Sequence, residues 1–291
     1  MAVQSVAIIG LGLLGGSIGL AIAKHCSDIT TTGYDADPAA CEAARTRGLA
    51  DVICDNAADA VAAADLVILC VPVGAMACAA DAIRDALPAG AIVSDVGSSK
   101  QSVADTLRAA LPGAVVIPAH PVAGTEQSGP DAGFAELFEG RWCILTPPEN
   151  TADEHIQTLC AFWESLGSTT EIMDAQHHDL VLAVTSHIPH LIAYTIVGTA
   201  SDLEEVTRSE VIKYSAGGFR DFTRIAASDP TMWRDVFLNN KDAVLEMLGR
   251  FTEDLTALQR AIRRSDGDAL HELFTRTRAI RRSIIEQGQD R

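Results

Sequence analysis

The residue best suited to acid–base chemistry is His120, which lies in VVIPAHPVAGTEQSG between two prolines and just after an apolar run. A neutral imidazole near pH 7 can accept a hydroxyl proton while a hydride leaves the same carbon. A lone histidine is more often a hydrogen-bonded structural group, but a position just beyond a strand favours the catalytic interpretation. We therefore expect His120 to be a general base.

A glycine-rich turn near the start of the chain has the spacing of a dinucleotide-binding loop. Gly10-Leu11-Gly12-Leu13-Leu14-Gly15 fits GxGxxG, follows the apolar run SVAII and precedes a helical stretch. The three glycines allow, in order, a tight turn, close approach of the backbone to a pyrophosphate, and close packing of helix on strand. Asp35 comes about 20 residues after Gly15, where a carboxylate accepts hydrogen bonds from the ribose hydroxyls. Asp35 would repel a 2′-phosphate and no Arg follows it in YDADPAA, so NAD is favoured over NADP.

Two further loops follow apolar runs that are typical of buried strands. Val71 and Pro72 follow LVILC, and Ser98 follows IVSDV. Ligands of open parallel sheets bind beyond the carboxyl ends of the strands, and Pro72 would present a rigid apolar edge to a nicotinamide ring. Ser98 alone is more typical of a helix cap for QSVADTLRAAL than of a catalytic group, although one hydroxyl can serve both roles. The residues expected to contact the cofactor are Gly10, Gly12, Leu13, Leu14, Gly15, Asp35, Val71, Pro72 and Ser98.

Four histidines gather in HHDLVLAVTSHIPH. His187 and His190 are three residues apart and share a helix face, beside a kink expected at Pro189. We expect His190 to face the substrate, with His187 behind it or at a hinge. With His177 and His178 these residues have no Cys or carboxylate partners at ligand spacing, so no metal site is predicted.

Arg220 and Arg224 lie four residues apart in GGFRDFTRIAASDPTMW. A guanidinium can bind a carboxylate through two parallel hydrogen bonds, which would make Arg224 a substrate clamp. Periodicity alone equally allows an internal salt bridge from Arg224 to Asp221 or Asp229.

The residues that follow apolar runs can lie together only if those strands end at the same edge of one sheet. The histidines and arginines later in the chain would lie on a separate helical part. In the first 115 residues, short apolar runs alternate with helical stretches of roughly 10–15 residues, which is typical of βαβ units and a parallel sheet covered on both faces. VVIPAHP and WCILTPP are expected to be two further strands of this part. From Asp174 onward, apolar residues recur at helical spacing. The sequence predicts an α/β chain, with a Rossmann-type parallel-sheet domain over residues 1–172 and an all-α domain over residues 173–291.

Composition argues against several classes of protein. The formal net charge of −17 disfavours non-specific nucleic-acid binding and binding to anionic membranes. Seven scattered cysteines without a CxxC pair disfavour a disulfide framework or a zinc site and favour a reducing compartment. The uncharged run from Val6 to Ala23 is nearly as long as a membrane span, but its glycines fit a strand, turn and helix better. A signal peptide would require a basic residue near its start, but no Lys or Arg precedes Lys24. We therefore expect a cytoplasmic protein.

Taken together, the motifs resemble the prephenate/arogenate (cyclohexadienyl) dehydrogenase family of tyrosine biosynthesis, in a form without a fused chorismate mutase. The resemblance rests on GLGLLGGS, VILCVP, DVGSSK, HPVAGTEQSG, HHDLVLAVTSHIPH and GGFRDFTRIAASDPTMW, which cover nearly the whole chain. It implies NAD-dependent oxidative decarboxylation of prephenate to 4-hydroxyphenylpyruvate. It also implies a homodimer formed by the C-terminal helices.

The resemblance assigns roles to individual residues. His120 would hydrogen-bond the ring hydroxyl and take its proton, and Ser98 would position that hydroxyl and the nicotinamide. Arg224 would bind a substrate carboxylate. Arg220 stands where relatives often carry Lys, which keeps the charge. The remaining residues implied around the substrate are His190, His187, Glu126 and Trp233.

Several alternatives remain open at this point. Arogenate, or both cyclohexadienyl substrates, could replace prephenate, because they differ only by an amino or keto group. A β-hydroxyacid dehydrogenase shares the predicted fold but would be expected to carry a catalytic Lys in the helix that here reads HHDLVLAVTSHIPH. An imine reductase would not need a base such as His120. A non-catalytic, NAD-responsive regulator would bind the cofactor without turnover.

Overall fold

The computed structural model describes residues 3–202 and 217–286. The chain divides into two compact units, residues 1–244 and 245–291. The first unit holds the α/β part together with the first helices of the helical part. Secondary structure does change from strands to helices after residue 172, but a domain boundary between residues 172 and 173 stays a prediction.

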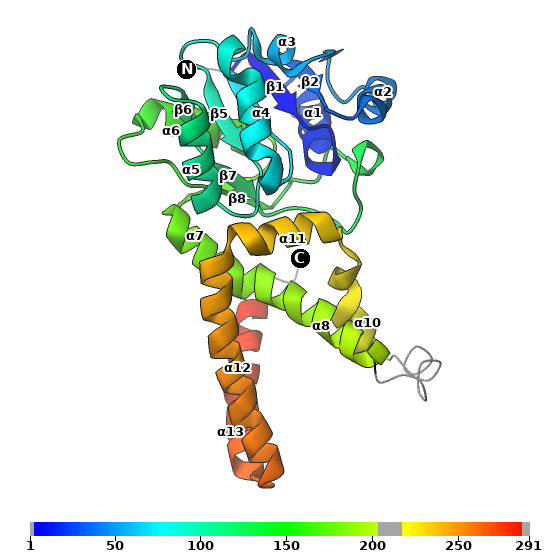
Figure 1. Ribbon diagram of the computed structural model, residues 1–291, viewed down its shortest axis with the longest axis vertical. Helices are drawn as coiled ribbons and strands as arrows, with labels where there is room; N and C mark the ends of the chain where they lie inside the picture. The colour runs from blue at the N-terminus through cyan, green and yellow to red at the C-terminus, as the bar shows by residue number, and fades with distance from the viewer. Residues whose placement is uncertain (1–2, 203–216, 287–291) are drawn as a thin grey trace. The chain divides into compact units, whose positions relative to one another are not determined.

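The main sheet has six parallel strands in the order β3-β2-β1-β4-β5-β6 (Figure 1). The strand order reverses between β1 and β4, and such a switch point is where ligands bind in doubly wound sheets. The central strands are almost entirely buried, as expected for a parallel sheet covered on both faces. The strands are β1 (Ser5–Ile9), β2 (Thr30–Tyr34), β3 (Val52–Ile53), β4 (Leu66–Leu69), β5 (Ile92–Asp95) and β6 (Val115–Val116).

Helices cover the two faces of this sheet and produce two apolar clusters. One cluster contains Ile18 of α1 and Trp163 of α6, and the other contains Met76 of α4 and Leu107 of α5. Burial on both faces confirms the predicted Rossmann-type arrangement. The helices are α1 (Leu13–His25), α2 (Pro38–Arg47), α3 (Ala57–Val61), α4 (Met76–Ile83), α5 (Gln101–Ala110) and α6 (Asp153–Ser165).

The run VVIPAHP does not form one strand of the main sheet. It divides into β6 and β7 (Ala119–Pro121), and β7 belongs to a second sheet with β8 (Trp142–Leu145) and β9 (Thr169–Ile172). Strand β7 pairs antiparallel with β8, so the expectation of parallel pairing is wrong here. The segment between them contains only a short 3₁₀ turn, and a parallel crossover needs about a dozen residues, usually including a helix.

The helical part begins with one long helical stretch that changes its geometry partway. Helix α7 (Ala175–Leu182) continues through the π-helical segment η4 (Ala183–His187) into α8 (Ile188–Asp202). The segment η4 ends two residues before Pro189, whose missing N–H group removes a regular α-helical hydrogen bond to the preceding turn. After residue 216 the chain forms α10 (Gly217–Thr223), η5 (Arg224–Ala227) and α11 (Pro230–Asn239).

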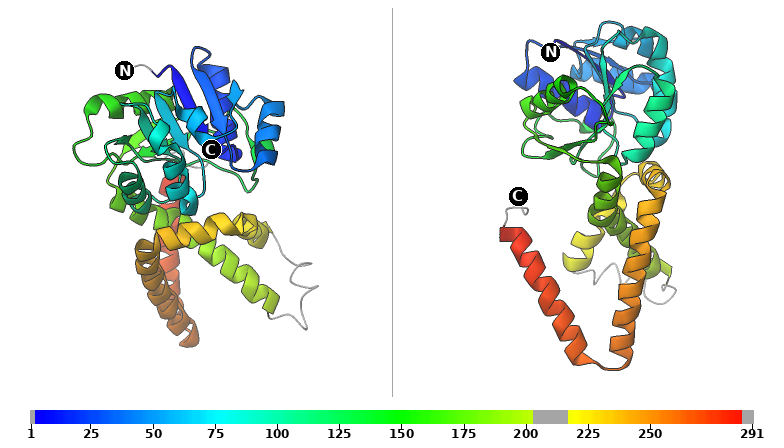
Figure 2. Two further views of the ribbon diagram at one scale, coloured as in Figure 1. Left: turned by 45° about the horizontal axis from the view of Figure 1, so that its top comes forward. Right: turned by 90° about the vertical axis from the view of Figure 1, so that its left-hand side faces the viewer.

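The second unit consists of most of α12 (Lys241–Arg263) and of α13 (Gly267–Glu286), joined by a short turn (Figure 2). Ser265 in the turn has a left-handed φ of 56°. The unit exposes large apolar side chains along both helices. They include Leu245, Leu255, Ile262, Phe274 and Ile280.

Candidate active site

The glycine loop after β1 has the geometry that a dinucleotide requires. Gly10 has φ 101°, and a Cβ atom on Gly15 would lie 1.9 Å from the carbonyl oxygen of Gly10. A Cβ on Gly12 would meet nothing within 4 Å, so space lies open in front of the first turn of α1. Gly12 caps α1 without a side-chain hydrogen bond, which leaves backbone N–H groups for a phosphate. Asp35 is fixed beside this loop, because its carboxylate accepts a hydrogen bond of 2.7 Å from the backbone N–H of Leu11.

His120 lies on β7 with 8% of its surface exposed. Its Nδ1 atom is 2.9 Å from Nε2 of His178, and Nδ1 of His178 is 2.8 Å from the carboxylate of Asp179. Burial holds the pKa of His120 well below its ordinary value, and the neighbouring His178 and Lys100 lower it further. His120 is therefore neutral near pH 7, as a general base must be.

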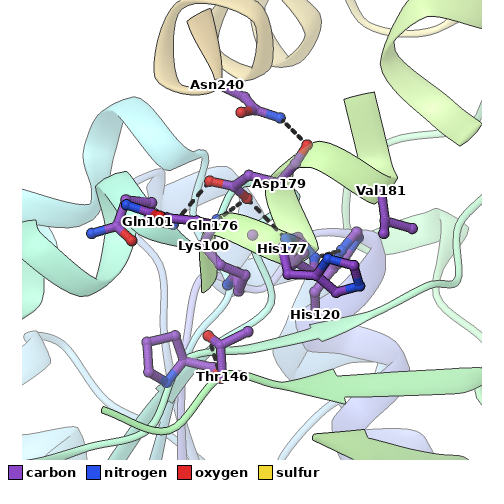
Figure 3. Close-up of polar contacts among 12 residues, drawn as sticks. Lys100, Gln101, His120, Thr146, Gln176, His177, Asp179, Val181 and Asn240 are labelled. Carbon is purple, nitrogen blue, oxygen red and sulfur yellow. Dashed lines mark hydrogen bonds and ion pairs between the residues drawn. The ribbon is translucent and has the colours of Figure 1, made fainter. Parts of the chain in front are cut away.

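Asp179 joins helix α7 to the beginning of α5. Its carboxylate accepts hydrogen bonds from the backbone N–H groups of Lys100 at 2.7 Å and Gln101 at 3.0 Å (Figure 3). It is thus the carboxylate at the N-terminus of α5, where the helix dipole favours negative charge. The alternative interpretation of Ser98 as the cap of this helix is wrong, because α5 has Lys100 at its N-cap without a side-chain cap. The Ser98 hydroxyl has no hydrogen-bond partner within the described part of the chain.

A fully buried ion pair anchors the strand that carries His120. Nζ of Lys100 lies 2.5 Å from the carboxylate of Asp95 and donates to the carbonyl of Ala119 at 2.7 Å. Asp95 accepts in turn from the backbone N–H of Ala119 at 3.2 Å and of Gly97 at 2.7 Å. Burial lowers the pKa of Lys100, and the charge of Asp95 works against that shift. The pair fixes the backbone one residue before His120.

The two predicted histidines of the helical part do lie together with Trp233. His190 stacks on Trp233 with 3.6 Å between ring centroids and an interplanar angle of 24°, and His187 meets the same ring edge-on at 6.0 Å. His187 is fully buried, and burial lowers its pKa to about 4. Its Nδ1 lies 3.1 Å from Nδ2 of Asn240, which also donates to the backbone carbonyl of Asp179 at 2.8 Å.

The π-helical segment explains how His178 and His187 can both be buried. Nine residues separate them, which is about two and a half turns of a regular α-helix and would place them on opposite faces. The wider turn of η4 rotates His187 back toward the buried side. A regular spacing of about 3.6 residues per turn therefore does not predict that His178 and His187 are both buried.

Arg224 forms an ion pair that the sequence did not suggest. Its guanidinium lies 3.3 Å from the carboxylate of Glu126, which stands in the loop between β7 and β8. The interpretation that Arg224 pairs with Asp221 or Asp229 is wrong, because Asp229 caps α11 and Asp221 pairs with Arg220 at 3.4 Å. Both Arg224 and Glu126 are partly exposed, so an incoming carboxylate can compete for the guanidinium.

The loop after β4 and helix α11 come into direct contact. A Cβ atom on Gly74 would lie 2.7 Å from a carboxylate oxygen of Asp235 on α11. The predicted cofactor edge at Val71 and Pro72 therefore lies next to the helix that carries Trp233. Residues that the sequence reading did not assign to the site are Lys100, Asp95, His178, Asp179 and Asn240.

Comparison with known proteins identifies the family. Sequence models of the prephenate dehydrogenase nucleotide-binding domain and dimerization domain match residues 18–172 and 174–276. The chain is 46% identical to a cyclohexadienyl dehydrogenase of Zymomonas mobilis, over 97% of this chain and 96% of the relative.

Solved structures agree with the sequence comparison. Prephenate dehydrogenase of Aquifex aeolicus, in complex with hydroxyphenyl propionate and NAD⁺, is 33% identical, with a TM-score of 0.90 over 98% of this chain and 99% of that chain. Synechocystis arogenate dehydrogenase is 26% identical, with a TM-score of 0.81 over 96% and 99%. The glycine loop, the buried imidazole of His120 and the matches along the whole chain place the protein in the prephenate dehydrogenase family of dehydrogenases.

Proposed function

We propose that the protein catalyses the NAD-dependent oxidative decarboxylation of prephenate to 4-hydroxyphenylpyruvate, and that it accepts arogenate as a second substrate. The observation that carries the proposal is His120, a buried neutral imidazole with one ring nitrogen already hydrogen-bonded and the other free for substrate. The relative from Zymomonas mobilis is a cyclohexadienyl dehydrogenase, a name that covers both substrates.

The residues present fit NAD as the cofactor. The open space at Gly12 and the uncapped start of α1 would hold the pyrophosphate, and Asp35 would accept hydrogen bonds from the ribose hydroxyls. Val71 and Pro72 would form an edge for the nicotinamide. When bound, NAD supplies the acceptor for a hydride. Because Asp35 would repel a 2′-phosphate, NADP should bind more weakly.

The mechanism follows from the substrate and from the base. The ring hydroxyl gives its proton to His120, and the hydrogen on the same carbon leaves with its electron pair as hydride. The resulting dienone is a vinylogous β-keto acid, so its carbonyl oxygen receives the electrons released when carbon dioxide departs. Aromatisation makes the reaction effectively irreversible. The Ser98 hydroxyl, which has no partner in the described chain, would orient the substrate oxygen toward His120.

Arg224 would hold a substrate carboxylate. A planar guanidinium binds a carboxylate through two charge-assisted hydrogen bonds, and the present partner Glu126 would be displaced by the substrate. His190 and Trp233 form a stacked wall, and Arg220 adds an exposed positive charge nearby in sequence. The positive charges of Arg224 and Arg220 match the two negative charges of a dicarboxylate substrate.

A homodimer would cover apolar surface that each unit of the chain exposes. In the first unit Ile196 and Val197 of α8 are about two-fifths exposed, and the second unit exposes apolar residues along α12 and α13. The stretch from Ala175 to Asp202 is even long and apolar enough to cross a membrane, by length and composition. Its polar residues His178 and Asp179 are buried in protein contacts, and the matching family domain is a dimerization domain, so we assign the apolar surface to a second copy.

The proposal is tested by measuring NADH or NADPH formation with purified protein, with prephenate and arogenate each offered with NAD and with NADP. Turnover of prephenate with NAD is the expected result. Turnover of arogenate alone would reassign the substrate, and a preference for NADP would show that the role given to Asp35 is wrong. Cofactor binding without turnover in any combination would favour the NAD-responsive regulator.

A further inference from the structure

Three buried side chains form a continuous line of hydrogen bonds from helix α7 to β7. Asp179 contacts His178 at 2.8 Å, and His178 contacts His120 at 2.9 Å. His178 is fully buried, Asp179 is 4% exposed, and neither is used in the mechanism above. The direction of each hydrogen bond in the line follows from Asp179, because its carboxylate can only accept.

The fixed end is Asp179. An ionised carboxylate only accepts hydrogen bonds, and this one already accepts from the backbone N–H groups of Lys100 and Gln101. The third contact must therefore also be a donor to the carboxylate. Nδ1 of His178 consequently carries a hydrogen.

His178 is the middle member of the line. Burial lowers the pKa of His178, so the ring is neutral near pH 7 and holds a single N–H group. Because that hydrogen is on Nδ1, Nε2 is an acceptor. The 2.9 Å contact then requires Nδ1 of His120 to be the donor.

The hydrogen bond to His178 determines which ring nitrogen of His120 carries the hydrogen. With its hydrogen on Nδ1, neutral His120 has its lone pair on Nε2, the nitrogen that has no partner within the described residues. An imidazole that accepts the substrate proton needs that lone pair at the nitrogen facing substrate.

We propose that His178 is a positioning residue, held by Asp179, that fixes His120 in the Nδ1–H tautomer and keeps the Nε2 lone pair available for the substrate hydroxyl. The role in turnover rests on the proposed function. In the proton step the substrate O–H bond breaks and an Nε2–H bond forms, so His120 becomes an imidazolium. Its Nδ1–H group stays bonded to neutral His178, with the negative Asp179 behind it.

The other polar groups near His120 are bound to other partners, which agrees with the Nδ1–H tautomer. Lys100 is paired with Asp95 and hydrogen-bonded to Ala119, so its ammonium does not contact the imidazole. His187 is engaged at Nδ1 by Asn240, which also donates to the carbonyl of Asp179. Figure 3 shows Asp179 between Asn240 and the beginning of α5. Contacts on both sides of Asp179 therefore hold helix α7 against the beginning of α5 and the end of α11.

Tautomers can be read directly by NMR of protein labelled with ¹⁵N at histidine, because protonated and unprotonated ring nitrogens have well-separated shifts. The His120 signals are identified by their loss in His120→Asn. We expect Nδ1–H in the wild-type protein, whereas free histidine favours Nε2–H. A wild-type His120 with its hydrogen on Nε2 would overturn the proposal, and this measurement needs no variant of His178 and no substrate.

Two substitutions separate positioning from mere packing. His178→Phe keeps the ring volume and removes the acceptor, whereas His178→Gln offers a side-chain oxygen in its place. We expect the Nδ1–H signature to persist in His178→Gln and to be lost in His178→Phe. His177→Gln, at the exposed neighbour on the same helix, is the matched control and should resemble wild type.

Kinetics with prephenate and NAD complete the test. We expect kcat of His178→Phe to fall by about 10²- to 10³-fold, with KM for prephenate and Kd for NAD nearly unchanged, as for a base held in the wrong tautomer. His178→Gln should recover most of that loss. A normal kcat in His178→Phe despite a changed tautomer, or equal losses in both variants, would overturn the positioning role. An Nδ1–H tautomer in a protein that turns over neither substrate would instead refute the proposed function alone.

Discussion

The loops at the carboxyl ends of the strands and the helices of residues 174–202 and 217–240 build the same site in different ways. The first of these regions supplies the glycine cradle, and strand β7 beside it supplies the imidazole of His120, the proposed base. The helical segment supplies side chains that act on those loops from outside, such as Asp179 at the N-terminus of α5 and Arg224 opposite Glu126. Chemistry therefore depends on one region, and orientation and substrate affinity depend on the other. Changes in the first region should lower kcat or stability. In the helices, changes at substrate-facing residues such as Arg224 should mainly raise KM, whereas changes at His178, which contacts His120, should lower kcat.

The largest effect is expected at the base. His120→Asn removes the proton acceptor while retaining a side chain of similar polarity, and kcat should fall by about 10²- to 10⁴-fold. The glycine loop is untouched, so NAD should bind normally in a calorimetric titration. Near-normal turnover would remove His120 from the mechanism and end the distinction between the two regions.

The buried ion pair of the loop region should matter for stability. Lys100→Met leaves Asp95 as a buried charge without its partner, which costs about 3–5 kcal/mol of unfolding free energy. Urea unfolding measures this loss. The matched control is Arg108→Met, which breaks an exposed pair with Asp105 and should cost less than about 1 kcal/mol. Equal costs would mean that the buried pair does not anchor β7.

In the helical region, Arg224→Ala should raise KM for prephenate by about 10- to 100-fold, because a charge-assisted hydrogen bond contributes about 1.5–3 kcal/mol. The change in kcat should be smaller. Arg234→Ala, at an exposed arginine of α11 paired with Asp235, serves as the control. An unchanged KM would mean that Arg224 serves only its ion pair with Glu126.

The smallest expected effect is on cofactor choice. Asp35→Asn removes a negative charge from the ribose end of the cofactor site, which should narrow the preference for NAD over NADP by about tenfold, or about 1–2 kcal/mol. The ratio of kcat/KM values for the two cofactors measures it. A ratio that does not move would place the discrimination elsewhere in the loop.

The two regions also differ in how far the sequence predicts them. The glycine loop was predictable because its function depends on missing side chains at fixed spacing, and the six-stranded sheet follows from buried apolar runs. Ser98 follows strand β5 as expected, whereas His120 lies within β7 rather than beyond the end of a strand. The antiparallel β7–β8 pair was not predictable in this way, since a long loop without a helix leaves strand direction open.

The supporting groups were hidden by geometry that only packing determines. Asp179 caps a helix more than seventy residues earlier, where a local cap such as Ser98 was the natural expectation. His178 and His187 share a buried environment only because η4 departs from regular helical spacing. The pairing of Arg224 with Glu126 spans 98 residues, and periodicity offers only local partners.

In the proposed mechanism His120 is a neutral base at physiological pH, and the pH dependence of kcat/KM for prephenate shows whether it is. Burial holds the pKa of His120 well below its ordinary value, so the imidazole gains a proton only in more acidic solution than an ordinary histidine does. Wild-type activity should therefore persist through the pH range in which an ordinary histidine is protonated, and should fall only below it. The fall should be absent from the residual activity of His120→Asn. The same acid limb in both proteins would exclude His120 as the base, because another group would then accept the proton.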